Sequence, residues 1–167
     1  NHSYGTIIQQ FYGAEAVSYD AYSWANKNFV AVFSAGNMGT AILAGIVREG
    51  LTDPINVRAT GLRREHLDEI HREHGVTTMM DNHAAIEGAD VVLICVKPQH
   101  LEPVLPELND RLPQQTLVIS IVAGATLDML SSGLNHGCII RTMPNTPAQI
   151  GQGITVWTAT DEVTEPQ

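Results

Sequence analysis

Short hydrophobic stretches alternate with segments of helical periodicity along most of the chain after Lys27. The first stretch, residues 29–33, is continuous and rich in aromatic and β-branched residues, as in a strand buried on both faces. From Met38 the apolar residues recur at helical spacing through Ile46, and Gly50 follows as a candidate C-cap. The pattern therefore predicts a strand that passes directly into a helix.

The alternation continues toward the C-terminus. Further strands are predicted at residues 55–60, 76–79, 90–96, 116–121, 138–143 and 153–158. Helices are predicted at residues 64–74, ending at Gly75, and at residues 101–111 and 127–134, with a helical turn capped by Asn82. This order predicts an α/β fold: a Rossmann-type, doubly wound parallel sheet in three layers (α/β/α) with right-handed crossovers.

The chain divides into three parts by pattern. Residues 1–27 carry most of the aromatic side chains without a clear period, and residues 14–24 could form a short helix. Residues 28–160 form the predicted nucleotide-binding domain, and residues 161–167 form a tail. Because the chain starts at Asn1 rather than Met, the origin of the first segment stays open.

Composition narrows the class of protein. The 167 residues suit one domain, and 44% hydrophobic with 16% charged residues is an ordinary globular balance. A net charge of −9 and a pI near 5.1 argue against nucleic-acid binding, which needs a concentrated basic face. No apolar run has membrane-spanning length, and a signal-peptide layout is missing. Cys95 and Cys138 are isolated and lie in apolar stretches, which predicts buried free thiols and a cytoplasmic location.

No metal site or nucleophilic triad is predicted. His71 and His74 share one face of a predicted helix, but no cysteine or acidic residue stands at a matching ligand spacing. Nothing resembles the turn that presents a nucleophilic serine. The catalytic residues therefore stay unassigned.

The turn after the first strand is the first candidate site. It reads Ser34-Ala35-Gly36-Asn37-Met38-Gly39, against the dinucleotide fingerprint G-x-G-x-x-G. The second and third glycines are present, while Ser34 replaces the first. A strand that meets a helix N-terminus through small residues aims free N–H groups at one point, which favours a phosphate. An ordinary strand–turn–helix is the alternative.

The second candidate follows the next strand, about 20 residues further on. Sites selective for NAD place a carboxylate there to bind the ribose hydroxyls. This chain has Thr60 and Gly61 followed by Arg63 and Arg64, and guanidinium groups can pair with a 2′-phosphate. The pattern favours NADP(H) over NAD(H), although arginines also begin helices at ordinary surfaces.

Three later loops follow strands at the same edge. Lys97 could stand near a phosphate or ribose, or simply extend from a strand end into solvent. Gly124 and the small residues around it could admit a flat ring, or serve an ordinary turn. In residues 143–147, Pro144 and Pro147 fix the backbone around Asn145 and Thr146, so the loop is shaped either for a ligand or as a rigid turn.

Four blocks in this order resemble pyrroline-5-carboxylate reductase: residues 33–39, 92–99, 120–124 and 141–147. The sequence Met143-Pro144-Asn145-Thr146-Pro147 is the most specific of them, and it fits other imine or β-hydroxyacid reductases less well. The resemblance implies reduction of the ring C=N of 1-pyrroline-5-carboxylate to L-proline with NADPH or NADH. Asn145 and Thr146 would then border the substrate. The residues that would bind the cofactor are Ser34, Ala35, Gly36, Asn37, Met38, Gly39, Thr60, Gly61, Arg63, Arg64, Asn82, Cys95, Val96, Lys97, Pro98, Ile121, Val122 and Ala123.

The resemblance covers about residues 29–157 and leaves part of the family pattern unmatched. Members of the family continue into a helical C-terminal domain that binds the substrate carboxylate and forms homo-oligomers, and this domain is expected to be missing here. The chain alone is therefore expected to bind NADP(H) and to turn over its small-molecule substrate poorly or not at all. The alternative is a non-catalytic NADP-binding or regulatory module.

Overall fold

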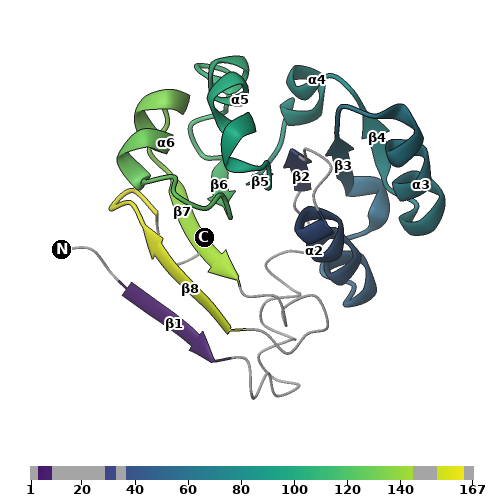
Figure 1. Cartoon of the computed structure of the whole chain (residues 1–167), viewed down its shortest axis with the longest axis horizontal. Helices are drawn as coiled ribbons and strands as arrows, with labels where there is room; N and C mark the ends of the chain where they lie inside the picture. Colours follow the sequence, from purple (N-terminus) through teal and green to yellow (C-terminus); the bar gives the residue numbers. More distant parts are fainter. Residues whose placement is uncertain (1–3, 9–28, 33–36, 145–153, 164–167) are drawn as a thin grey trace.

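The computed structural model describes residues 4–8, 29–32, 37–144 and 154–163. A single eight-stranded sheet runs through these ranges in the order β1-β8-β7-β6-β5-β2-β3-β4 (Figure 1). Its six parallel strands are β2 (Phe29–Val32), β3 (Val57–Thr60), β4 (Thr77–Met79), β5 (Val91–Ile94), β6 (Leu117–Ser120) and β7 (Ile139–Pro144). Their order is that of a doubly wound Rossmann sheet, which confirms the predicted fold class.

Helices cover both faces of the sheet. The helices are α2 (Asn37–Arg48), α3 (Arg64–His74), α4 (Asn82–Ile86), α5 (Leu101–Leu108) and α6 (Leu127–Leu134), and the short 3-10 turns are η1 (Pro54–Asn56) and η2 (Pro98–His100). Strand β5 shows the layering, because Val92 and Ile94 belong to the core beneath α4, α5 and α6. Val91 and Leu93 belong to the core beneath α2 and α3. Successive strand residues point to opposite faces, so both faces of β5 are buried.

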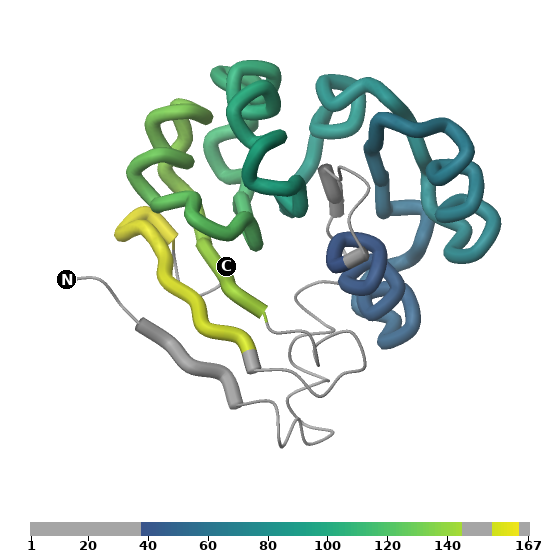
Figure 2. Tube along the Cα trace, viewed as in Figure 1, coloured from purple at the N-terminus to yellow at the C-terminus, as the bar shows by residue number. Residues whose placement is uncertain are grey.

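The outer two strands run against the other six. Strand β8 (Ile154–Ala159) pairs antiparallel with β7, and β1 (Tyr4–Ile8) pairs antiparallel with β8. Figure 2 shows the yellow segment that ends at residue 163 folding back beside β7. The alternating pattern predicted a strand at 153–158 but not its direction, and it predicted no strand at 4–8. The predicted helix at 14–24 lies outside the described residues.

Local sequence signals predicted some helix ends correctly and others not. Helix α3 has the predicted bounds, and its C-cap Gly75 adopts a left-handed φ of 71° that glycine tolerates best. The predicted cap at Asn82 is wrong, because Asp81 is the N-cap and accepts hydrogen bonds from the N–H groups of His83 and Ala84. The helix predicted at 101–111 stops at Leu108. Within the described residues, no helix is both long and apolar enough to cross a membrane.

Candidate functional site

The carboxyl ends of the parallel strands form one edge of the sheet. Val32, the last residue of β2, is in register with both Thr60 on β3 and Ile94 on β5, and Ile94 is in register with Ser120 on β6. The loops that follow these strands therefore leave the sheet side by side. Strand order reverses between β2 and β5, and this is the place where ligands bind in sheets of this type.

Helix α2 begins at this edge. Its first residue is Asn37, Met38 is half-buried, and Gly39 is buried in the first turn. The N–H groups of a first turn have no partner within the helix and form the positive end of its dipole. Ser34, Ala35 and Gly36, which the sequence analysis assigned to the phosphate-binding turn, lie outside the described residues.

Thr60 supplies the observation that tests whether the edge fits a dinucleotide. Its side chain is 1% exposed, and its Oγ1 has no hydrogen-bond partner among the described residues. A buried hydroxyl without a partner costs free energy, so such groups are rare unless a ligand or water completes them. Thr60 is the last residue of β3, the strand next to β2, so its unpartnered hydroxyl belongs to the carboxyl edge of the sheet. A polar group of a ligand bound at this edge would supply the missing partner, and in this respect the described residues fit a dinucleotide.

The two arginines predicted to contact the cofactor remain available. Arg63 has an extended backbone and precedes α3, and Arg64 is its first residue; both are exposed, and neither forms an ion pair among the described residues. Arg58, on the same strand as Thr60, is used differently. Its guanidinium donates to the carbonyl oxygens of Ala85 and Glu87 at 3.1 and 2.7 Å and so caps the end of α4.

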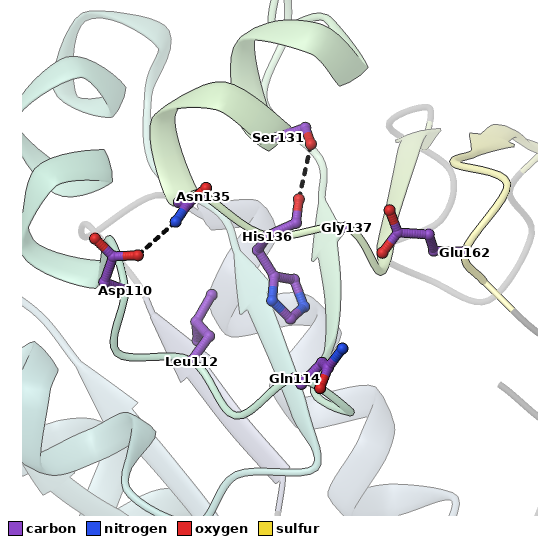
Figure 3. Close-up of a pocket in the computed structure, with 8 residues that line it drawn as sticks. All are labelled: Asp110, Leu112, Gln114, Ser131, Asn135, His136, Gly137 and Glu162. Atoms are coloured by element: carbon purple, nitrogen blue, oxygen red, sulfur yellow. Dashed lines mark hydrogen bonds between the residues drawn. The ribbon is translucent and has the colours of Figure 1, made fainter.

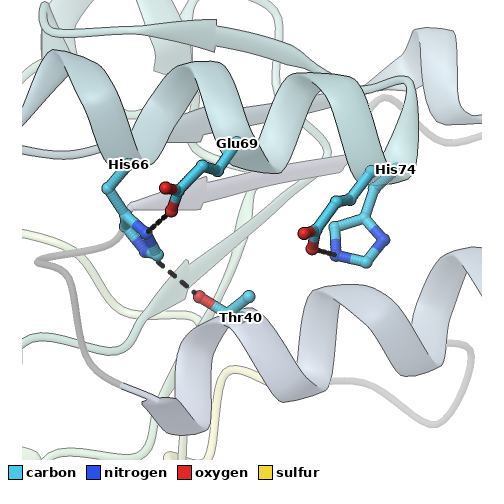
Figure 4. A network of polar contacts seen from close by, with 5 residues as sticks. Thr40, His66, Glu69 and His74 are labelled. Atoms are coloured by element: carbon cyan, nitrogen blue, oxygen red, sulfur yellow. Dashed lines mark hydrogen bonds and ion pairs between the residues drawn. The ribbon is translucent and has the colours of Figure 1, made fainter.

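A polar contact that the sequence analysis did not find joins α2 to α3 (Figure 4). Thr40 Oγ1 lies 3.5 Å from His66 Nε2, and His66 Nδ1 lies 3.5 Å from the Glu69 carboxylate. Both Thr40 and His66 lie in the first turn of a helix that follows one of two adjacent parallel strands. These matching positions in the two helices are the sequence signal from which the contact could have been predicted. The contact links the first turns of the two helices.

Directly after β5, two of the predicted cofactor-binding residues have buried side chains. Cys95 and Val96 are 6% and 4% exposed, so their side chains belong to the core rather than to an open cleft. Burial raises the pKa of the Cys95 thiol, since the low-dielectric surroundings disfavour the thiolate. Lys97 and Pro98 are exposed, and the lysine backbone is extended where it precedes η2. Lys97 is thus the residue of this loop that could reach a phosphate.

The loop after β6 is shaped by a buried serine. Ser120 Oγ accepts a hydrogen bond from the N–H of Val122 at 3.3 Å, and Gly124 takes a left-handed φ of 80°. These two features tighten the turn. Val122 is buried, Ile121 is half-buried and Ala123 is exposed. The exposed residues Ala123 and Gly124 carry little side-chain bulk, which is what the sequence analysis expected beside a planar ring.

One predicted cofactor-binding residue, Asn82, is engaged with another helix instead. Asn82 donates from its side-chain amide to Glu107 on α5 at 2.7 Å. Asn145 and Thr146, the predicted substrate-side residues, lie outside the described ranges. His71 contacts the carbonyl oxygen of Val76 through Nδ1 at 2.8 Å, and the described residues hold no group of three histidine, cysteine or acidic side chains suited to a metal.

Comparison with known proteins shows which part of the chain resembles them. The family model described as NADP oxidoreductase, coenzyme F420-dependent, matches residues 29–124. The chain is 33% identical over 133 residues to a pyrroline-5-carboxylate reductase from Corynebacterium melassecola, covering 77% of the chain and 49% of the relative. It is 35% identical over 127 residues to the reductase of Escherichia coli, covering 75% and 47%. The chain thus spans about half the length of these relatives.

A solved structure agrees with this placement. The pyrroline-5-carboxylate reductase from Coxiella burnetii superposes with a TM-score of 0.75 at 32% identity, covering 83% of this chain and 52% of that one.

Proposed function

Because the chain belongs to the NADP oxidoreductase, coenzyme F420-dependent, family, we propose that the carboxyl edge of its sheet binds NADP(H). We further propose that these residues form the cofactor-binding half of a pyrroline-5-carboxylate reductase. The observation that carries the proposal is the buried, unpartnered Thr60 hydroxyl at the end of β3, beside two arginines that no described acidic residue neutralises.

Different residues of this edge bind different parts of the dinucleotide. The first turn of α2, from Asn37 to Gly39, donates N–H groups toward the diphosphate. Thr60 accepts or donates at the adenosine ribose. Arg63 and Arg64 supply fixed positive charge and paired N–H donors for a 2′-phosphate, which is what distinguishes NADP(H) from NAD(H).

Bound NADPH supplies a hydride, and the acceptor suggested by the relatives is the ring C=N of a pyrroline carboxylate. The role of this chain is to orient the nicotinamide and exclude water. Ile121 and Ala123, which follow directly after β6, would pack against the ring, and the hydrogen bond from the N–H of Val122 to Ser120 Oγ stabilises the turn between them. We assign no proton-transfer residue within the described ranges.

A binding experiment tests the cofactor proposal. NADPH and NADH are titrated into the chain and followed by nucleotide fluorescence, with the variant Arg63→Ala/Arg64→Ala alongside. Loss of two phosphate contacts should weaken NADPH by about tenfold or more and leave NADH nearly unchanged. Arg72→Ala is the matched control, because Arg72 is exposed at the opposite end of α3. Equal losses for both nucleotides would refute the 2′-phosphate assignment.

An activity assay tests the second proposal, that these residues are the cofactor-binding half of a pyrroline-5-carboxylate reductase. The matched region covers only about half of each relative, 49% and 47%, so we propose that substrate turnover also needs residues outside the matched half. NADPH oxidation in the presence of pyrroline-5-carboxylate should be far slower with these 167 residues than with a full-length relative. Turnover at the full rate would show that the substrate site is already complete. Binding of NADPH without turnover in any longer form would favour the regulatory module.

A further inference from the structure

The side chain of His66 has no role in the function proposed above, although it lies beside two groups assigned to the cofactor. His66 belongs to the first turn of α3, and its ring points toward the first turn of α2 (Figure 4). Its Nε2 lies 3.5 Å from Thr40 Oγ1 on α2. The start of α2 is assigned to the diphosphate and the start of α3 to the 2′-phosphate, so the imidazole lies near both proposed phosphate positions.

The two ring nitrogens of His66 have different partners. Nδ1 lies 3.5 Å from the carboxylate of Glu69, and because a carboxylate only accepts, Nδ1 carries the proton in the neutral ring. Nε2 then accepts from the Thr40 hydroxyl. When the ring gains a second proton, Nε2 becomes a donor and Thr40 Oγ1 accepts instead. Protonation therefore reverses this hydrogen bond and adds a positive charge beside the first turn of α2.

The carboxylates around the ring balance that charge only in part. Helix α2 and strand β4 are the described elements that pack most closely on α3. The charged residue of α2 is Arg48, in the last turn of that helix, and β4 has none. On α3, Glu65 and Asp68 are exposed, and the side chain of Glu69 is 57% exposed, so water screens these carboxylates. The field of a protonated His66 at the start of α2 is therefore reduced but not cancelled.

Thr60 gives a separate indication that a polar ligand binds near this ring. Its hydroxyl is 1% exposed and has no partner among the described residues, and it ends the strand that leads into α3. Arg63 and Arg64 follow, are exposed, and form no ion pair within the described part of the chain. A phosphate bound by these arginines would be close enough for a charge on His66 to act on it.

On the basis of the cofactor site proposed above, we propose that His66 determines cofactor specificity: its protonated ring attracts the 2′-phosphate and favours NADP(H) over NAD(H). Arginine is charged throughout the physiological range, whereas histidine gains its charge as the pH falls from about 8 to about 5. The preference for NADP(H) therefore increases as the pH falls through this range. NAD(H) lacks the 2′-phosphate, so its affinity changes less.

The test is a calorimetric titration of the 167-residue chain with NADP⁺ and with NAD⁺, at about pH 6 and about pH 8 and constant ionic strength. The quantity compared is the ratio of the Kd for NAD⁺ to the Kd for NADP⁺. In His66→Gln this ratio should be about threefold below that of the wild type at pH 6, and the two should agree at pH 8. Phosphate monoesters also change charge near pH 6, and comparison at the same pH removes that contribution.

Two further variants complete the design. His66→Lys carries its charge at both pH values, so its ratio should exceed that of the wild type about threefold at pH 8 and match it at pH 6. This variant keeps the question open to test even if His66→Gln folds poorly. His74→Gln is the matched control, because His74 lies in the last turn of the same helix, 3.9 Å from Glu73, and its loss should leave the ratio unchanged.

The outcomes separate this proposal from the one on which it rests. A ratio that His66→Gln leaves unchanged at pH 6, or equal losses of affinity for both nucleotides, would overturn the role of His66, since a merely structural effect on α2 changes both alike. A ratio for His66→Lys equal to that of the wild type at pH 8 would overturn it as well. Failure of the wild-type chain to bind NADP⁺ at either pH would instead refute the cofactor site itself.

Discussion

Replacing Thr60 by valine should stabilise the chain and weaken NADPH binding at the same time. The Thr60 hydroxyl is buried at 1% exposure and lacks a partner among the described residues. Valine exchanges that hydroxyl for a methyl group of similar size, so the packing around β3 is retained. The cost of burying an unpaired polar group disappears from the folded state, while the group that would contact the ribose is also lost.

The two effects can be estimated. An unsatisfied buried hydroxyl costs about 1–3 kcal/mol, so the free energy of unfolding should rise by about 1 kcal/mol or more. For a chain of this size that corresponds to an increase in Tm of about 2–4 °C. Loss of one neutral hydrogen bond to the cofactor, about 1 kcal/mol, should raise the Kd for NADPH about fivefold.

Thr116→Val is the matched control. Thr116 is also fully buried, but its hydroxyl donates to the carbonyl oxygen of Ala89 at 2.7 Å. The same substitution there removes a satisfied bond and leaves a buried carbonyl group with one partner fewer, so it should destabilise the chain by about 1–3 kcal/mol. Unfolding in urea gives the stabilities, and nucleotide fluorescence gives the affinities.

The reasoning fails in either of two cases. Destabilisation by Thr60→Val comparable to that by Thr116→Val would mean that the hydroxyl is satisfied in the folded chain. Stabilisation without any change in NADPH affinity would mean that the hydroxyl does not face the cofactor.

Further expectations concern two glycines and the two cysteines. Gly45→Ala should stabilise α2 by about 1 kcal/mol, because a Cβ there meets no atom within 4 Å, as urea unfolding would show. Gly133→Ala in α6 should instead destabilise, since its Cβ would lie 2.7 Å from Leu105 Cδ1; equal effects would contradict the packing. Burial raises the pKa of Cys95, so iodoacetamide should label the half-buried Cys138 first, as mass spectrometry of peptides would show. Because that pKa is higher in the folded state, stability should fall as pH rises above the ordinary thiol pKa of about 8.5.

The sequence by itself determined the local elements and the edge of the sheet at which the site is proposed. Periodicity and capping depend on residues close in the chain, so α3 and its left-handed Gly75 were predictable. Strand–helix alternation with right-handed crossovers then brings the carboxyl ends of the strands together. Thr60, Arg63 and Arg64 could be assigned to that edge for this reason.

Only the tertiary structure decided which polar side chains near that edge of the sheet are already used in contacts with other parts of the fold. Arg58 and Arg63 look alike in the sequence, yet only Arg58 is used to cap α4, because long-range packing of α4 against β3 brings its carbonyl groups within reach. The direction of β8 and the pairing of β1 likewise depend on contacts between distant segments. The pocket lined by Asp110, His136 and Glu162 exists only once three separated segments meet (Figure 3). Local sequence determines backbone conformation, but distant contacts determine which polar groups lose water and which find a partner.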